Sequence, residues 1–214
     1  MSRVVDISTI SDGKEYRYDD SVRIGCDGCD GKSICCHEMC DTIILDPYDI
    51  YSLQCGLGLT FDELLTGTIE LNVEDGIILP NIKKQPFNQG CGYLDDKGRC
   101  NIHDYRPGFC RLFPLGRAYE NDKLYYFVQI HECKCNDIHD VDVKDWIGIE
   151  NIKEYEKFIL SWHKYIKALK EKVRTIKNPE EIKSLSMNML KLFYLTPYDT
   201  EKDFYTQFNE RLGL

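Results

Sequence analysis

Hydrophobic and polar positions follow a helical period over the last third of the chain. From residue 151 to residue 177, apolar and aromatic side chains recur every three or four positions, and lysines occupy much of the opposite face. This pattern predicts one long amphipathic helix, with its lysine-rich face in solvent. The predicted apolar face consists of Ile152, Tyr155, Ile159, Trp162, Ile166, Leu169 and Val173.

Two shorter helices are predicted to follow the long one. Asn178 can cap the first of them, and Pro179 then occupies the first helical position, which proline favours. We expect this helix to run to about Tyr194. Thr200 can cap a last helix over residues 201–211.

The first half of the chain has a different pattern, in which short elements alternate with turns. Residues 43–45 are an apolar run that predicts a short buried strand. Asp46 then provides a helix cap and Pro47 a first helical residue, so a helix is expected up to about Gly56. Thr60 is placed to cap a second short helix.

Further strands are predicted where β-branched and aromatic residues gather. Residues 69–73 and 77–82 are two such runs, and the Asp75-Gly76 step between them predicts a hairpin. Residues 124–130 form another strand-like run.

Cysteines are the most informative residues of the sequence. Five of the eleven lie in the fifteen-residue run CDGCDGKSICCHEMC. Cys26 and Cys29 form a C-x-x-C pair, a short spacing that lets two thiolates bind one metal ion, and Cys35 and Cys36 are adjacent. The alternative interpretation, cysteines buried as small hydrophobic side chains, suits Cys55 in its apolar surroundings better than these polar, glycine-rich positions.

A second cysteine group follows further along the chain. Cys91 and Cys100 flank a predicted turn at residues 95–98, and pairing of the two arms would bring these cysteines close together. Pro107 then fits the first position of a short helix that carries Cys110 in its first turn, where the helix dipole favours a thiolate.

Two arginines, Arg106 and Arg111, bracket Cys110. They either donate hydrogen bonds to anionic sulfur or another anion, or they form ordinary surface ion pairs. The first interpretation has a physical basis, because four thiolates around Zn(II) leave a net charge of about −2 that must be balanced or solvated. We therefore predict Arg106 and Arg111 as cofactor-binding residues.

Composition and charge limit the partners and the cellular compartment that are expected for this protein. A net charge of −9 argues against nucleic-acid and anionic-membrane partners. The N-terminus has no apolar signal core, and no apolar run approaches the roughly 18 residues of a membrane span. An odd number of cysteines, about 5% of the residues, indicates reduced thiols rather than a disulfide scaffold. We expect a cytoplasmic protein.

The ordered motifs C-x-x-C, C-C, D-P-Y-D-I and C-x8-C-x-I-H-x-Y-R-P-x-x-C-R-L-F-P resemble the YkgJ-type cysteine-cluster family, a zinc- or iron-chelating domain, over residues 22–135. The gap between Cys29 and Cys35 is longer than in the family pattern, and Cys40, Cys55 and Cys135 are additional. The resemblance implies eight metal ligands. These are Cys26, Cys29, Cys35, Cys36, Cys91, Cys100, Cys110 and Cys133.

The expected cofactor is zinc or an iron–sulfur cluster such as [4Fe-4S], since cysteine thiolates bind both. Because neighbouring side chains of an extended chain point to opposite sides, Cys35 and Cys36 are hypothesised to serve different metals. His37, His103 and His131 lie near the cysteines, but the five histidines show no catalytic zinc spacing.

Three functional interpretations stay open. The first is a metal-binding module whose surface serves a protein partner. The second is an iron–sulfur enzyme, for redox chemistry or for protein lysine methylation, as in the flagellin lysine methylases, which resemble the same family. The third is a metal carrier or thiol redox sensor.

The elements together predict the α+β class, with short strands and cysteine-bearing loops packed on C-terminal helices. We expect residues 1–148 to form a cysteine-cluster metal-binding domain. Residues 149–214, which contain no cysteine, are expected to form a helical extension packed on it.

Overall fold

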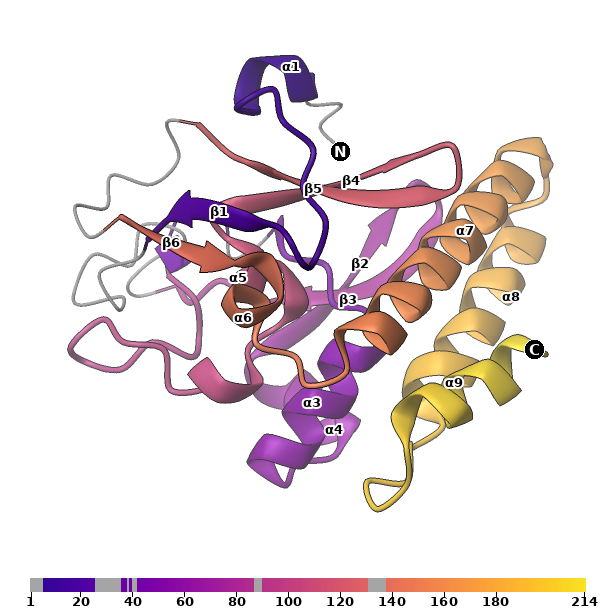
Figure 1. Ribbon diagram of the computed structural model, residues 1–214. Coiled ribbons are helices and arrows are strands. Elements are labelled where there is room, and N and C mark those ends of the chain that lie inside the picture. The colour runs from indigo at the N-terminus through magenta and orange to yellow at the C-terminus, as the bar shows by residue number, and fades with distance from the viewer. Residues whose placement is uncertain (1–5, 26–35, 38, 40–41, 87–89, 131–137) are drawn as a thin grey trace.

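The computed structural model of the protein describes residues 6–25, 36, 37, 39, 42–86, 90–130 and 138–214 (Figure 1). Within these residues, short antiparallel strands form three two-stranded sheets, and the longest helices lie in the C-terminal third. The fold is therefore α+β, as the sequence predicts. In the same part of the chain, no helix is both long enough and apolar enough to cross a membrane.

The first sheet joins the N-terminal segment to the residues that precede the long helix. After the short helix α1 (Ile7–Ile10), strand β1 (Ser21–Ile24) pairs with β6 (His139–Asp142). The short helix α6 (Val143–Ile147) follows β6 directly. Neither β6 nor α6 was predicted, because each is short and the strand is polar.

The helix that follows the first cysteine run begins where its capping residues place it. Helix α3 (Pro47–Leu57) has a reciprocal capping box: Asp46 accepts a hydrogen bond from the Asp49 N–H at 2.9 Å, and Asp49 accepts one from the Asp46 N–H at 3.0 Å. The helix ends at Gly58, whose φ of 67° is readily available to glycine. The last helical residue, Leu57, agrees with the predicted end at about Gly56.

The next elements confirm the predicted helix and hairpin. Thr60 caps α4 (Phe61–Gly67), and strands β2 (Ile69–Glu74) and β3 (Ile77–Ile82) pair around a turn in which Asp75 and Gly76 have positive φ. The predicted strand at residues 43–45 lies on the other side of β3. There it forms an isolated bridge, from Ile44 to Asn81.

A second hairpin consists of β4 (Leu115–Glu120) and β5 (Lys123–Val128). The sequence predicts β5 but not β4, because Gly116 and Arg117 interrupt its apolar pattern. Gly116 is required by packing, since a Cβ there would lie 2.2 Å from the Phe127 ring.

Three helices form one side of the molecule (Figure 1). Helix α7 (Ile152–Thr175) buries most of the predicted face, although Ile166 and Leu169 are only partly buried. Helix α8 (Pro179–Leu190) continues into a π-helical turn, Lys191–Leu195. Helix α9 (Phe204–Leu212) begins later than predicted, because Asp203 rather than Thr200 is its cap.

The lysine-rich face of α7 also contacts the hairpin turns. Lys170 forms an ion pair with Asp75 in the β2–β3 turn at 2.8 Å, and Lys164 pairs with Asp122 in the β4–β5 turn at 2.9 Å. These contacts add little stability by themselves, because their side chains are partly solvated. They place the two hairpins along the same helix.

Aromatic rings fill the core beneath these helices. Phe208 of α9 is fully buried, and its ring centroid lies 4.7 Å from that of Phe158 and 5.6 Å from that of Phe193. Tyr194 donates a buried hydrogen bond to the carbonyl of Leu45 at 2.9 Å. The C-terminal helices are thereby held against the segment that starts α3.

Replacing a buried ring of this core should destabilise the protein. We expect Phe208→Ala to lower the free energy of unfolding by about 3–5 kcal/mol, because it leaves a cavity that neighbouring rings cannot fill. Urea unfolding of the purified variant measures this. Leu192→Ala, at a position that is 38% exposed, is the control and should cost less than about 1 kcal/mol. Equal losses in the two variants would contradict the packing described.

Candidate metal centre

A main-chain hydrogen bond joins the two cysteine groups. The N–H of Cys91 donates to the carbonyl of Cys36 at 2.8 Å, so the end of the first cysteine run lies beside the start of the second. Both side chains are partly buried. Gly90 lies close to His37 here, since a Cβ at this position would be 3.2 Å from the His37 ring. Two predicted ligands that are distant in sequence are therefore neighbours in space.

The predicted turn at residues 95–98 is present. The Gly98 N–H donates to the Asp95 carbonyl at 3.0 Å, and Gly98 has a φ of 74°. In the main chain, Cys100 forms an isolated β-bridge with Leu94, and Cys91 forms one with Lys84. The turn thus brings the second arm back toward the first.

Tyr93 lies close to both of these cysteines. Burial raises the pKa of its phenol, the Thr68 hydrogen bond lowers it, and the negative charge of the Cys91 and Cys100 thiolates raises it further. The Thr68 hydroxyl donates to the Tyr93 oxygen at 2.5 Å.

Cys110 lies on a short helix whose start is capped from elsewhere in the fold. Helix α5 (Gly108–Leu112) follows the 3-10 turn η2 (His103–Tyr105). The sequence predicts Pro107 as the first helical residue, but in the structure Pro107 is the N-cap. Proline has no side-chain acceptor for this role. The carboxylate of Asp49 accepts the Gly108 N–H instead, at 2.7 Å.

The capping carboxylates are buried beside an arginine. Burial raises the pKa of Asp46 well above its usual value, and the charge of Asp49 raises it further. Burial also raises the pKa of Asp49, against the hydrogen bond from Gly108 and the positive charge of Arg117, which lower it. Arg117 in turn donates to the Tyr155 hydroxyl at 3.4 Å. A charged network thus lies directly behind the helix that carries Cys110.

The two predicted arginines contact main-chain and histidine groups. Arg111 donates to the carbonyls of Arg106 at 3.0 Å, Gly148 at 3.5 Å and Asp104, and so joins α5 to the end of α6. Arg106 contacts both ring nitrogens of His103, at 2.8 and 2.6 Å, and donates to the His103 carbonyl at 2.9 Å. Binding of an anion by these arginines stays a prediction.

Several predicted residues fall outside the described part of the chain. Among the residues that the structure does describe, no three His, Cys, Asp or Glu side chains are grouped so as to hold a metal ion. The donor chemistry of the described cysteines fits zinc or iron–sulfur binding, because thiolate sulfur is a favoured ligand of both. The predicted residues outside the described ranges are Cys26, Cys29, Cys35, Cys133, Cys40, Cys135 and His131.

Cys55 differs from the cysteines of the two groups. The apolar surroundings in sequence suggested a buried side chain, and this interpretation is wrong: Cys55 lies on α3 and is exposed. Partial burial still raises the pKa of the Cys55 thiol, while a hydrogen bond with Tyr51 lowers it. Cys55 is a suitable reference thiol for experiments on the others.

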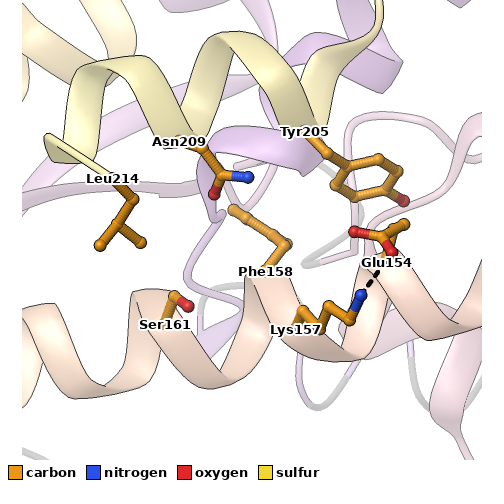
Figure 2. Close-up of a pocket in the computed structure, with 7 residues that line it drawn as sticks. All are labelled: Glu154, Lys157, Phe158, Ser161, Tyr205, Asn209 and Leu214. Atoms are coloured by element: carbon orange, nitrogen blue, oxygen red, sulfur yellow. Dashed lines mark hydrogen bonds and ion pairs between the residues drawn. The ribbon is translucent and has the colours of Figure 1, made fainter.

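A shallow cavity of about 280 Å³ lies between α7 and α9 and offers a different kind of lining (Figure 2). Glu154 and Lys157, both on α7, form an ion pair at one edge of it, at 2.6 Å. The lining includes neither cysteine nor histidine, so this cavity has no soft metal ligands. The lining residues are Glu154, Lys157, Phe158, Ser161, Tyr205, Asn209 and Leu214.

The sequence was also compared with known families and proteins. The model of the CxxCxxCC family, described as "Putative zinc- or iron-chelating domain", matches residues 25–134. The chain belongs to the CxxCxxCC family. The match spans both cysteine groups. It also includes α3 and α5, which are joined by the hydrogen bond from Gly108 to Asp49. No curated protein and no solved structure matches this CxxCxxCC protein.

Sequence reasoning missed the network behind Cys110. Nothing in the local sequence around Asp49 indicates a hydrogen bond to Gly108. Arg117 lies in the strand that was not predicted, and Tyr155 was assigned only to the apolar face of the long helix. The proline before Gly108 is the one local signal, since it leaves the short helix without a side-chain cap of its own.

The buried carboxyl of Asp46 makes the stability of this CxxCxxCC protein dependent on pH. Because its pKa is higher in the folded than in the unfolded state, the folded protein binds more protons between the two values. Its contribution to the free energy of unfolding therefore falls as pH rises from about 4 through the folded pKa. Asp46→Asn keeps a capping oxygen and should remove a fall on the order of 1 kcal/mol.

Urea unfolding of metal-free protein between about pH 4 and pH 8 measures this effect. Glu63→Gln is the control of opposite sign. Hydrogen bonds from Thr60 lower the pKa of Glu63, so its contribution is present above its unfolded pKa and is lost as pH falls. An unchanged pH profile in Asp46→Asn would contradict the assignment.

Proposed function

We propose that this CxxCxxCC protein is a metal-binding module that holds zinc or an iron–sulfur cluster through cysteine thiolates. The observation that carries the proposal is the hydrogen bond from Cys91 to Cys36, because it brings cysteines of two separate motifs together. The proposed ligands are Cys26, Cys29, Cys35, Cys36, Cys91, Cys100, Cys110 and Cys133.

The position of Cys36 supports the hypothesis that Cys35 and Cys36 bind different metals. Cys36 lies beside Cys91, so we assign it to a group with Cys91, Cys100, Cys110 and Cys133. The first four of these side chains are not grouped around one point in the described structure, so binding of the metal would have to draw them together. Cys35 then joins Cys26 and Cys29. The alternation hypothesis assumed an extended chain. Cys36 and His37 are helical in the structure, so the division rests on the contact between Cys36 and Cys91 instead. The division gives two thiolate groups, which bind either two metal ions or one cluster and one ion.

The proposed site is structural or electron-transferring rather than hydrolytic. Zinc that activates water needs an open coordination position, and four thiolates leave none. We further propose that residues 149–214 act as a helical extension that supports the cysteine domain. The many thiols require a reducing compartment, which favours the cytoplasm.

Metal and acid-labile sulfide content of protein purified without oxygen tests the proposal. Zinc without sulfide would identify a redox-inert module and remove electron transfer. Iron with an equal amount of sulfide and a brown colour would identify a cluster, and would keep an iron–sulfur enzyme as the alternative. Protein with neither metal, and with eleven titratable thiols, would contradict the proposal.

Single cysteine variants identify the ligands. We expect Cys36→Ser and Cys91→Ser each to weaken metal retention by at least about tenfold, since even partners of metal ligands matter at that level. Competition with a chelator at fixed pH measures retention. Cys55→Ser is the matched control and should retain metal like the wild type. If all three variants behaved alike, the assignment of Cys36 and Cys91 would be wrong.

A further inference from the structure

We propose that Asp49 is the positioning residue for Cys110, and that Tyr155 supports the same helix from the C-terminal layer. The proposal concerns how α5 is held, and it rests on the proposed function only where it speaks of metal. Neither residue contacts a cysteine sulfur in the contacts described above. Both act through Gly108, the first residue of the helix that carries Cys110.

Helix α5 depends on its neighbours for its position. It has five residues, and a helix of that length is not stable alone, because the cost of forming its first turn is recovered only over longer helices. Its N-cap, Pro107, makes no side-chain hydrogen bond. The bond from the Gly108 N–H to Asp49 therefore fixes its start, and the bonds of Arg111 to main-chain carbonyls hold its other end.

The Asp49 carboxylate is itself held in one orientation. One oxygen accepts the Gly108 N–H at 2.7 Å, and the other accepts the Asp46 N–H at 3.0 Å. The side chain belongs to a residue that is only 3% exposed. Because one Asp49 oxygen binds the start of α5 and the other binds the start of α3, the side chain fixes the two helix starts relative to each other.

Tyr155 closes the other side of Gly108. A Cβ at Gly108 would lie 2.1 Å from the Tyr155 oxygen, so the main chain of α5 packs directly against this hydroxyl. Tyr155 is 1% exposed and accepts a hydrogen bond from Arg117 at 3.4 Å. The long C-terminal helix thus contributes a rigid surface to the placement of Cys110.

Selective alkylation of metal-free protein tests this placement directly. Iodoacetamide labelling followed by peptide mass spectrometry gives the rate at each cysteine, with Cys55 as the internal reference. We expect Asp49→Ala to raise the rate at Cys110 by about tenfold, as the loss of a buried cap would. Cys55 and Cys100 should keep their rates. Asp49→Asn, which retains one acceptor oxygen, should restore much of the protection.

Two further variants keep the test decisive. Glu63→Gln alters an equivalent capping box on α4 and should leave the rate at Cys110 unchanged. Tyr155→Phe should raise the rate at Cys110 selectively, and it decides the matter if Asp49→Ala does not fold. The proposal is overturned if Cys110 stays within about twofold of the wild type in the Asp49 and Tyr155 variants. A rise at all cysteines together in Asp49→Ala indicates general unfolding, and the rates in Tyr155→Phe then decide. A rise at Cys110 no larger than at the other cysteines in Tyr155→Phe would overturn the proposal too.

Cobalt(II) extends the test to the metal. Thiolate-to-cobalt absorption reports how many sulfurs bind the ion. We expect Asp49→Ala to lose part of this absorption and to release cobalt to a chelator about fivefold to tenfold faster than the wild type. Wild-type protein that binds no cobalt would count against the proposed function, and the alkylation rates would still decide the role of Asp49. Unchanged absorption and release in Asp49→Ala would overturn the positioning role.

Discussion

The main-chain hydrogen bond between Cys91 and Cys36 constrains the path of the whole segment between these two residues. It closes a loop that contains α3, α4 and the β2–β3 hairpin, so these elements must pack compactly for the two cysteine groups to meet. Closing a loop of this length costs conformational entropy. Burial of the apolar faces of α3, α4 and β3 offsets this cost. A metal bound by both cysteine groups would stabilise the closed loop further.

The helical layer contributes to the site through a buried charge network. Asp46, Asp49, Arg117 and Tyr155 come from α3, β4 and α7, and they meet at the start of α5. Burying charged groups is costly unless they are paired and hydrogen-bonded. Here the main-chain N–H groups of α3 and α5 supply much of the pairing. The C-terminal helices, which contain no cysteine, are thus connected to Cys110 through Tyr155.

The sequence predicted those parts of the fold that depend on local physics. Asp46 and Pro47 begin α3 as expected, and the Asp75-Gly76 step forms its hairpin, because caps and tight turns are specified within a few residues. Strand β4 was missed because Gly116 and Arg117 have roles set by Phe127 and Tyr155, which lie far away in sequence. The start of the last helix was wrong because Asp203 competes with Thr200 as a cap.

The candidate site divides in the same way. Both cysteine groups are visible in the sequence, because metal ligands are chosen by chemistry and spacing. The contact between Cys36 and Cys91 and the cap on Gly108 are tertiary, so no local pattern reveals them. Cys55 shows the reverse error, since apolar neighbours in sequence do not decide which face of a helix is buried.

X-ray absorption at the edge of the bound metal tests the central claim most directly, because it reads the atoms that surround the ion. We predict a first shell of about four sulfur atoms, at about 2.3 Å if the metal is zinc. A first shell dominated by nitrogen or oxygen at about 2.0–2.1 Å would contradict thiolate binding.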